Sequence, residues 1–161
     1  PEVLMDGEHD IDICFAVTER TLNTQYSELD KMQVYLKGTL LKPNMILPGM
    51  GCQQQATVEE VAQKTVDCLN ATVPPAVPGV MFLSGGQSDI EATAHLNAMN
   101  AMQDEHPWEL SYSYGRAMQH PALVAWAGEE SNVEAAQSTI SHRAKMNSLA
   151  RSGDWSEDLE D

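Results

Sequence analysis

The first third of the chain passes from a helical to an extended pattern of apolar residues. From Asp10 to about Met32, apolar side chains recur mostly every three to five positions, which predicts a helix with one buried stripe. The stripe consists of Ile13, Val17, Leu22, Tyr26, Leu29 and Met32. Residues 34–41, VYLKGTLL, are rich in aliphatic and β-branched side chains and predict a strand buried on both faces near its C-terminal end. Prolines and glycines between residues 43 and 51 then predict a loop.

Three later helix starts are each predicted by a capping box, in which a Ser or Thr is followed three residues later by Glu. The hydroxyl can accept from the free amides of the first helical turn, and the glutamate can reach back to the cap. The boxes are Thr57–Glu60, Ser88–Glu91 and Ser131–Glu134. The helices that they open are predicted to run to about Asn70, Met102 and Ala150.

Two further apolar runs lie between these helices. Residues 80–84, VMFLS, and residues 108–113, WELSYS, predict buried strands. A short helix is expected to run from the second of them to Trp126, either kinked or started by Pro121. Because strands and helices alternate strictly, the pattern predicts an α/β fold of parallel strands with outer helices and right-handed crossovers.

Three parallel strands leave both edges of a sheet bare and cannot close a barrel. A (β/α)8 TIM barrel needs at least about 200 residues, whereas this chain has 161. Two architectures stay open from the pattern alone. One is an open sheet completed by strands that the pattern does not reveal, and the other is the second half of a barrel.

Charge and hydropathy exclude some classes of function. Nine Lys and Arg stand against 24 Asp and Glu, for a net charge of −15, and no basic stripe is present, so we expect no nucleic-acid partner. No apolar run reaches the length of about 18 residues that a membrane span requires. Residues 151–161 are acidic and lack apolar periodicity, so we expect a flexible tail after a domain of residues 1–150.

The cysteines and histidines indicate neither a disulfide framework nor a metal site. Cys14, Cys52 and Cys68 are widely spaced, no CxxC occurs, and no histidine lies beside them at ligand spacing. Reduced thiols suit an intracellular compartment. The chain starts at Pro1 without a charged and apolar leader, so no targeting peptide is expected.

Lys42 is the first candidate for chemistry, because it stands at the end of the strand predicted over residues 34–41. The carboxyl ends of parallel strands form the rim on which α/β proteins build their active sites. Thr39, Leu40 and Leu41 precede the lysine, so an apolar wall is expected around it. Such surroundings favour the neutral amine, which is a nucleophile toward carbonyl carbon. The alternative is an ordinary lysine that extends to solvent at a strand end.

Two turns at strand ends are the next candidates. Ser84-Gly85-Gly86 ends one predicted strand, and the stretch from Ser113 to Arg116 ends the next. Glycines allow a ligand close to the backbone, and free amides at a helix start attract anions. Arg116 adds a guanidinium that suits phosphate. Each turn alone is equally compatible with an ordinary strand–helix connection, but together they favour a phosphate site. The acidic net charge opposes an anion only at long range, because salt screens charges beyond about 8–10 Å.

Four segments resemble class I fructose-bisphosphate aldolases. They occur in the family's order, each at or near the end of a predicted element, and the resemblance runs from Pro1 to about Gly153. It corresponds to the C-terminal half of the family's (β/α)8 barrel. The segments are GTLLKPNM (38–45), PPAVPGVMFLSGGQS (74–88), LNAMN (96–100) and SYGRA (113–117).

The resemblance implies a role for individual residues. Lys42 resembles the lysine that forms the Schiff base, and Glu2 resembles a carboxylate that supports it. The substrate phosphate is expected to bind two loops, whose matching residues are Ser84, Gly85, Gly86, Ser113, Gly115 and Arg116. Because the iminium itself is the electron sink, no metal and no other cofactor are implied.

The implied reaction is the cleavage of fructose 1,6-bisphosphate to dihydroxyacetone phosphate and glyceraldehyde 3-phosphate, or its reverse, in glycolysis, gluconeogenesis or the Calvin cycle. The family's remaining catalytic residues lie on the other half of the barrel, so we expect this chain to be inactive alone and to need that N-terminal half. A homotetramer in the cytoplasm or plastid stroma is also implied. One alternative is a non-catalytic, aldolase-derived binding or structural subunit; another is a different Schiff-base or phosphate-binding barrel.

Overall fold

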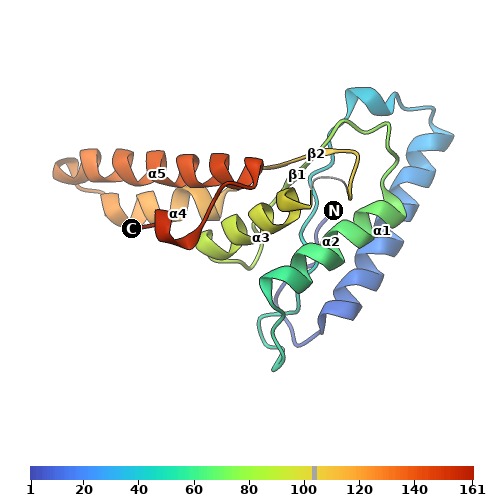
Figure 1. Cartoon of the computed structure of the whole chain (residues 1–161), viewed down its shortest axis with the longest axis horizontal. Helices are drawn as coiled ribbons and strands as arrows, with labels where there is room; N and C mark the ends of the chain where they lie inside the picture. Colours follow the sequence, from blue (N-terminus) through green and yellow to red (C-terminus); the bar gives the residue numbers. More distant parts are fainter. Residues whose placement is uncertain (103–104) are drawn as a thin grey trace.

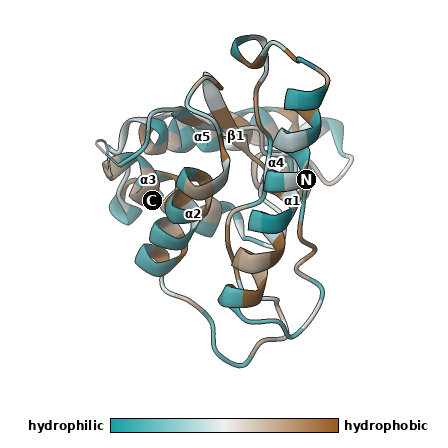
Figure 2. Ribbon diagram, turned by 90° about the vertical axis from the view of Figure 1, so that its right-hand side faces the viewer, coloured by the Kyte–Doolittle hydropathy of each residue, from teal (hydrophilic) through white to brown (hydrophobic). Residues whose placement is uncertain are grey.

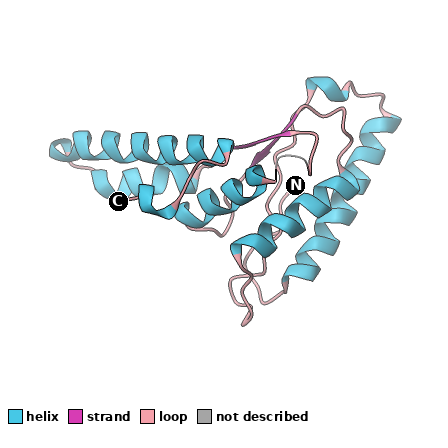
Figure 3. Ribbon diagram, viewed as in Figure 1, coloured by secondary structure: helices cyan, strands magenta, loops and turns pink. Residues whose placement is uncertain are grey.

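The computed structural model describes residues 1–102 and 105–161, in which helices flank a small parallel sheet (Figures 1 and 3). The α1–α2 pair lies at one end of the molecule and the α4–α5 pair at the other, with α3 and the strands between them. The helices and strands are α1 (Ile11–Lys31), α2 (Val58–Thr72), β1 (Gly79–Phe82), α3 (Asp89–Ala101), β2 (Glu109–Tyr112), α4 (Arg116–Trp126) and α5 (Val133–Ser152). Short 3₁₀ turns are η1 (Leu36–Gly38), η2 (Glu130–Asn132) and η3 (Glu157–Leu159).

The sheet is parallel, as the sequence predicts. Strands β1 and β2 pair with Val80 opposite Leu110. On the other side of β1, Leu41 forms a parallel bridge to Val80. The Leu41 amide donates to the Gly79 carbonyl at 3.2 Å, and its carbonyl accepts from Met81 at 2.8 Å. The segment after η1 therefore lies beside β1 and extends the sheet by a short parallel bridge.

The strand predicted over residues 34–41 is wrong in most of its length. Residues 36–38 form η1 instead, and Tyr35 and Leu40 are 73% and 62% exposed. The aliphatic composition indicated a buried strand, but extended pairing starts only at Leu41, which is 2% exposed. Pairing depends on a neighbouring strand, and β1 begins only at Gly79, opposite the end of the apolar run.

Local capping explains where several helices begin. The Asp10 carboxylate accepts from the Ile13 amide at the start of α1. The predicted box at Ser88 forms in both directions, with the Glu91 side chain accepting from the Ser88 amide at 2.8 Å. At Thr57 the hydroxyl accepts from the Glu60 amide. These caps satisfy amides that the first helical turn leaves free.

The third predicted box, Ser131–Glu134, does not form. Ser131 lies inside η2, and α5 begins at Val133 after an Asn132 cap without a side-chain hydrogen bond. The tight 3₁₀ turn occupies the residues that would have to be extended for capping. The alternative in which Pro121 starts the short helix is also wrong, because α4 begins five residues earlier, at Arg116, and contains the proline.

The core lies between the helices and one face of the sheet. Val80, Phe82 and Leu110 are at most 1% exposed on that face, together with buried residues of α2 and α3. Hydrophilic and hydrophobic residues both recur along α1 and α2, as amphipathic helices require (Figure 2). No described helix has the length and apolar character that crossing a bilayer requires.

Residues 151–161, which the sequence predicts to be flexible, contact the helices in this structure. The Trp155 amide donates to the Asn97 side chain on α3 at 3.0 Å. Glu160 forms an ion pair with the buried Arg143 on α5, and its carboxylate lies 3.1 Å from His142 Nε2. Acidic composition does not reveal such contacts, because they depend on where α3 and α5 lie in the fold. The division of the chain at residue 150 stays a prediction.

Candidate active site

Three chain segments end at the same edge of the sheet. The Leu83 amide donates to the Pro43 carbonyl at 3.0 Å, and the Ser113 amide donates to the Phe82 carbonyl at 2.8 Å. Lys42, Ser84 and Ser113 are thus one residue from these bonds or directly in them. The parallel register therefore places the three sequence candidates at one rim.

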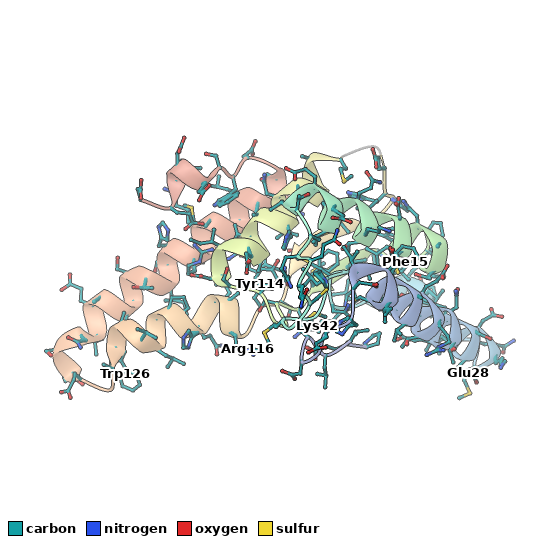
Figure 4. The ribbon with its side chains drawn as sticks, turned by 90° about the horizontal axis from the view of Figure 1, so that it is seen from below. Phe15, Glu28, Lys42, Tyr114, Arg116 and Trp126 are labelled. Atoms are coloured by element: carbon teal, nitrogen blue, oxygen red, sulfur yellow. The ribbon has the colours of Figure 1, made fainter. Side chains whose placement is uncertain are left out.

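Lys42 lies on the sheet face opposite to the helix-covered core. Leu41 is buried, and successive side chains of an extended segment point to opposite faces, so Lys42 projects away from α2 and α3. The lysine is exposed, and it forms no salt bridge within residues 1–102 and 105–161. Figure 4 shows it in the middle of the molecule, between the α1–α2 and α4–α5 pairs.

The expectation of an apolar wall around Lys42 is therefore wrong for this chain. Leu40, two residues earlier, shares its direction and is itself largely exposed. Apolar neighbours in sequence give a buried wall only where another element covers their face, and the described helices cover the opposite one.

The glycine turn, Ser84-Gly85-Gly86, follows β1 and packs against Glu2 and Met5 near the N-terminus. Gly86 has φ +77°, a left-handed conformation that favours glycine, and a Cβ there would overlap Met5. A Cβ at Gly85 would lie 2.5 Å from Glu2 Oε1. A larger side chain at Gly86 would require Met5 to move, and one at Gly85 would displace the Glu2 carboxylate. Of the two glycines, only Gly86 is exposed.

Ser84 and Tyr114 connect this turn to the start of α4. Ser84 is 5% exposed, and its hydroxyl accepts from the Ala117 amide at 3.4 Å. The Tyr114 hydroxyl donates to the Ala92 carbonyl at 2.8 Å, and burial raises the pKa of this phenol well above its usual range. Ser84 thus caps α4 here, while Tyr114 anchors the loop and leaves Gly115 and Arg116 exposed.

An open pocket of about 390 Å³ joins the two predicted phosphate loops. Gly86 and Ser88 form one side, and Arg116 and His120 of α4 form another. The pocket walls do not include Lys42, Ser84, Gly85, Ser113 or Gly115. Of the predicted anion-binding residues, the structure therefore brings Gly86 and Arg116 together in one cavity. His120, one helical turn after Arg116, was missed because a lone histidine carries little signal.

Glu2 lies against the glycine turn rather than in that pocket. Its carboxylate is beside Gly85, and the next residue is fixed by a hydrogen bond from the Val3 amide to Asn44 Oδ1 at 3.0 Å. Asn44 belongs to the segment that carries Lys42. Glu2 thus stands between the lysine segment and the turn, where its negative charge opposes an anion bound directly at Gly85.

A buried histidine stands behind the turn. His95 of α3 is 5% exposed, and its Nδ1 lies 2.7 Å from Gln87 Nε2. Burial lowers the pKa of His95 to about 4, against the opposing effect of Glu91 and Glu59. No group of three or more His, Cys, Asp or Glu side chains is arranged to hold a metal ion in residues 1–102 and 105–161.

Comparison with known families decides the relationship of the chain. The family model described as "Fructose-bisphosphate aldolase class-I" matches residues 1–161. The chain belongs to this family. The partial barrel, the parallel strands and the sequence resemblance agree with that membership.

Individual aldolases are similar over nearly the whole chain. A probable class 1 fructose-bisphosphate aldolase of Xylella fastidiosa is 51% identical over 156 residues, 96% of this chain and 46% of the relative. Fructose-bisphosphate aldolase C of Pan troglodytes is 52% identical over all 161 residues, which correspond to 44% of its length. The chain thus spans a little under half the length of these aldolases.

A solved aldolase structure confirms the predicted fold. Fructose-bisphosphate aldolase of Plasmodium falciparum, crystallised in complex with TRAP and a small-molecule inhibitor, superposes with a TM-score of 0.93 at 46% identity. The match covers 97% of this chain and 45% of that one. The chain therefore has the fold of part of an aldolase TIM barrel. The roles of Lys42, Glu2 and the two loops stay predictions.

Proposed function

We propose that this chain supplies the Schiff-base lysine and a phosphate site of a class I fructose-bisphosphate aldolase. The reaction is the reversible cleavage of fructose 1,6-bisphosphate to dihydroxyacetone phosphate and glyceraldehyde 3-phosphate. The supporting observation is the shared rim, on which the segment of Lys42 lies directly beside the end of β1 that leads into the glycine turn. Through Gly86 this turn shares a pocket with Arg116.

Lys42 is the proposed nucleophile. Its neutral amine attacks the C2 carbonyl, and loss of water gives an iminium. When the C3–C4 bond breaks, its electron pair moves to the iminium and leaves an enamine, while the C4 hydroxyl proton goes to a base and the aldehyde departs. Protonation of the enamine and addition of water release dihydroxyacetone phosphate and restore the amine.

The substrate phosphate is proposed to bind between the glycine turn and Arg116. The backbone at Gly86 is accessible, and the Arg116 guanidinium, which lines the same pocket, supplies a positive charge that suits phosphate. Ser84, Gly85, Ser113 and Gly115 are proposed to shape these loops. Fixing the phosphate holds the ketone over the amine, and such positioning supplies several kcal/mol of the barrier reduction.

The exposed Lys42 requires a cover before it can act. We propose that the N-terminal half of the aldolase barrel, in the same polypeptide or as a partner, packs against the sheet face on which Lys42 and Leu40 lie. This contact removes water from the amine and adds the family's acid–base groups, while Glu2 serves as support. A homotetramer in the cytoplasm or plastid stroma is proposed from the family resemblance.

Reductive trapping tests the covalent role. With the complete barrel and dihydroxyacetone phosphate, borohydride should reduce the iminium to a secondary amine on Lys42, detectable by peptide mass spectrometry. Lys42→Met should abolish the adduct. Lys64→Met is the matched control, because Lys64 of α2 pairs with Asp12 of α1 on the surface. This substitution should leave the adduct at Lys42 unchanged. A complete barrel that forms no adduct at Lys42 contradicts the proposal.

The second candidate is a non-catalytic, aldolase-derived subunit. The observation in its favour is the solvent exposure of Lys42 in this chain. Adding the N-terminal half of an aldolase barrel distinguishes the two. Gain of cleavage activity and of the Lys42 adduct supports the enzyme, whereas a stable complex without either supports the binding subunit.

A further inference from the structure

The glycine turn of the proposed phosphate site is joined to two other elements through one side chain. Gln87, directly after Gly86, places its Nε2 2.7 Å from His95 Nδ1 on α3. The same nitrogen lies 3.2 Å from the sulfur of Met45. Met45 follows Lys42 by three residues, so the Gln87 amide lies at the junction of the turn, α3 and the lysine segment.

The two nitrogens that meet set the direction of this contact, because an amide nitrogen can only donate, and a neutral His95 accepts at Nδ1 when its proton is on Nε2. Because His95 is buried, its pKa falls to about 4, and the imidazole is neutral at pH 7. A neutral ring can accept at Nδ1, so the Gln87 amide N–H donates to it. Glu91 and Glu59 are the carboxylates that act on His95, and both favour its charged form less strongly than burial opposes it.

The turn depends on side-chain contacts because its two glycines supply little rigidity of their own. Two consecutive glycines have wide conformational freedom, and Gly86 is held in the left-handed region. The capping box fixes Ser88, but it lies on the helix side of the turn. On the described residues, the Gln87 side chain alone reaches from the turn to both α3 and the Lys42 segment by polar contacts.

We propose that His95 is a positioning residue, which through Gln87 holds the glycine turn at a fixed place relative to the segment that carries Lys42. The inference rests on the proposed function for the identity of the anion, a substrate phosphate. The Gln87–His95 contact does not depend on the proposed function. His95 touches neither the substrate nor the reacting atoms in this assignment.

A ligand-free measurement tests the contact. In His95→Leu, amide hydrogen exchange at Gln87 and Ile46 should accelerate about tenfold or more, because these amides donate to the Ser84 carbonyl and the Thr65 hydroxyl on either side of the contact. His95→Gln retains an acceptor and should return exchange toward the wild-type rate. His106→Leu is the matched control, because His106 also makes one side-chain hydrogen bond, to the Trp108 carbonyl at 2.9 Å, but at the opposite end of β2. Unchanged exchange in His95→Leu overturns the inference.

A second measurement tests the consequence for binding. Titration of the complete protein with inorganic phosphate should give a dissociation constant about tenfold higher for His95→Leu than for wild type and His106→Leu. His95→Gln should recover most of the affinity. In the aldolase assay, the KM of His95→Leu should rise more than its kcat falls, because saturating substrate still reaches Lys42.

The two proposals fail in different ways. If Lys42 forms no borohydride adduct but His95→Leu still loosens the turn and weakens phosphate binding, the positioning role stands and the catalytic role falls. If Lys42 forms the adduct while His95→Leu binds phosphate and exchanges like wild type, the positioning role falls. Equal loss of phosphate affinity in His95→Leu and His95→Gln also contradicts it, because the acceptor would then have no special part.

Discussion

Single residues show how burial changes chemistry in this chain. His95 and His120 are both close to the glycine turn, but His95 is buried on α3 and His120 is exposed in the pocket. The buried ring is neutral and accepts a hydrogen bond, whereas the exposed ring can add a donor beside Arg116. The surroundings, rather than the residue type, therefore assign one histidine to structure and the other to the pocket wall.

The low pKa of His95 predicts a pH-dependent stability. The folded state holds the ring near pKa 4, whereas the ordinary value is 6.5. Between these values the unfolded chain binds more protons, so stability is complete above about pH 6.5 and is lost as pH falls toward 4. The loss amounts to roughly 3.5 kcal/mol at most, since each pKa unit corresponds to about 1.4 kcal/mol.

Urea unfolding at a series of pH values from 4.5 to 7.5 measures this effect. In His95→Leu this part of the pH dependence should disappear, although its stability at pH 7 also falls through the lost hydrogen bond. A variant with the same slope as wild type would assign the acid sensitivity to other groups.

Gly86→Ala should destabilise the protein more than Gly128→Ala. Both glycines have φ near +78°, at +77° and +79°, so both substitutions strain the backbone by roughly 1 kcal/mol or more. Only at Gly86 does the new Cβ overlap Met5, while nothing lies within 4 Å of a Cβ at Gly128. The difference in unfolding free energy between the two variants isolates the overlap, and equal losses would show that Met5 moves aside without cost.

At the scale of elements, local signals were readable from the sequence and pairing signals were not. The box at Ser88 depends on residues three apart, and it forms as predicted. The strand expected over residues 34–41 depends on β1, far along the chain, and pairing starts only at Leu41. The Gln87–His95 contact likewise spans a turn and two helical turns, so neither residue type nor spacing indicated it. The family motifs supplied Gly86 and Arg116, but only folding brings them into one pocket.

Ser84→Ala tests how the start of α4 is held. The hydroxyl accepts from the Ala117 amide, which the first turn of α4 leaves without a helical partner. Its removal should cost about 0.5–1.5 kcal/mol and accelerate amide exchange in the first turn of α4. Ser113→Ala is the control, because the Ser113 side chain is exposed and the hydrogen bond from its amide to the Phe82 carbonyl involves only the backbone. Equal exchange in the two variants would mean that α4 is stable without this cap.

At the scale of the whole molecule, the helices are distributed unevenly over the sheet. One face of β1 and β2 is buried under helices, with Val80 and Leu110 almost inaccessible. The other face carries Lys42 and the largely exposed Leu40. Solvation of Leu40 costs about 25 cal/mol for each Å² of apolar surface. A covering element on this face therefore gains free energy from the leucine and at the same moment removes water from the lysine.

This coupling predicts how Lys42 reacts with an acylating reagent. In the 161-residue chain, acetic anhydride should modify Lys42 about as fast as Lys31, whose side chain is 63% exposed. In a complete barrel the rate at Lys42 should change at least several-fold relative to Lys31, because the covering half alters both its access and its hydration. Lys64, paired with Asp12 on the outer surface of α1, is the control and should react equally in both forms. If Lys42 keeps its relative rate in the complete barrel, the face that it shares with Leu40 stays open to water, and the amine lacks the dry surroundings that Schiff-base chemistry needs.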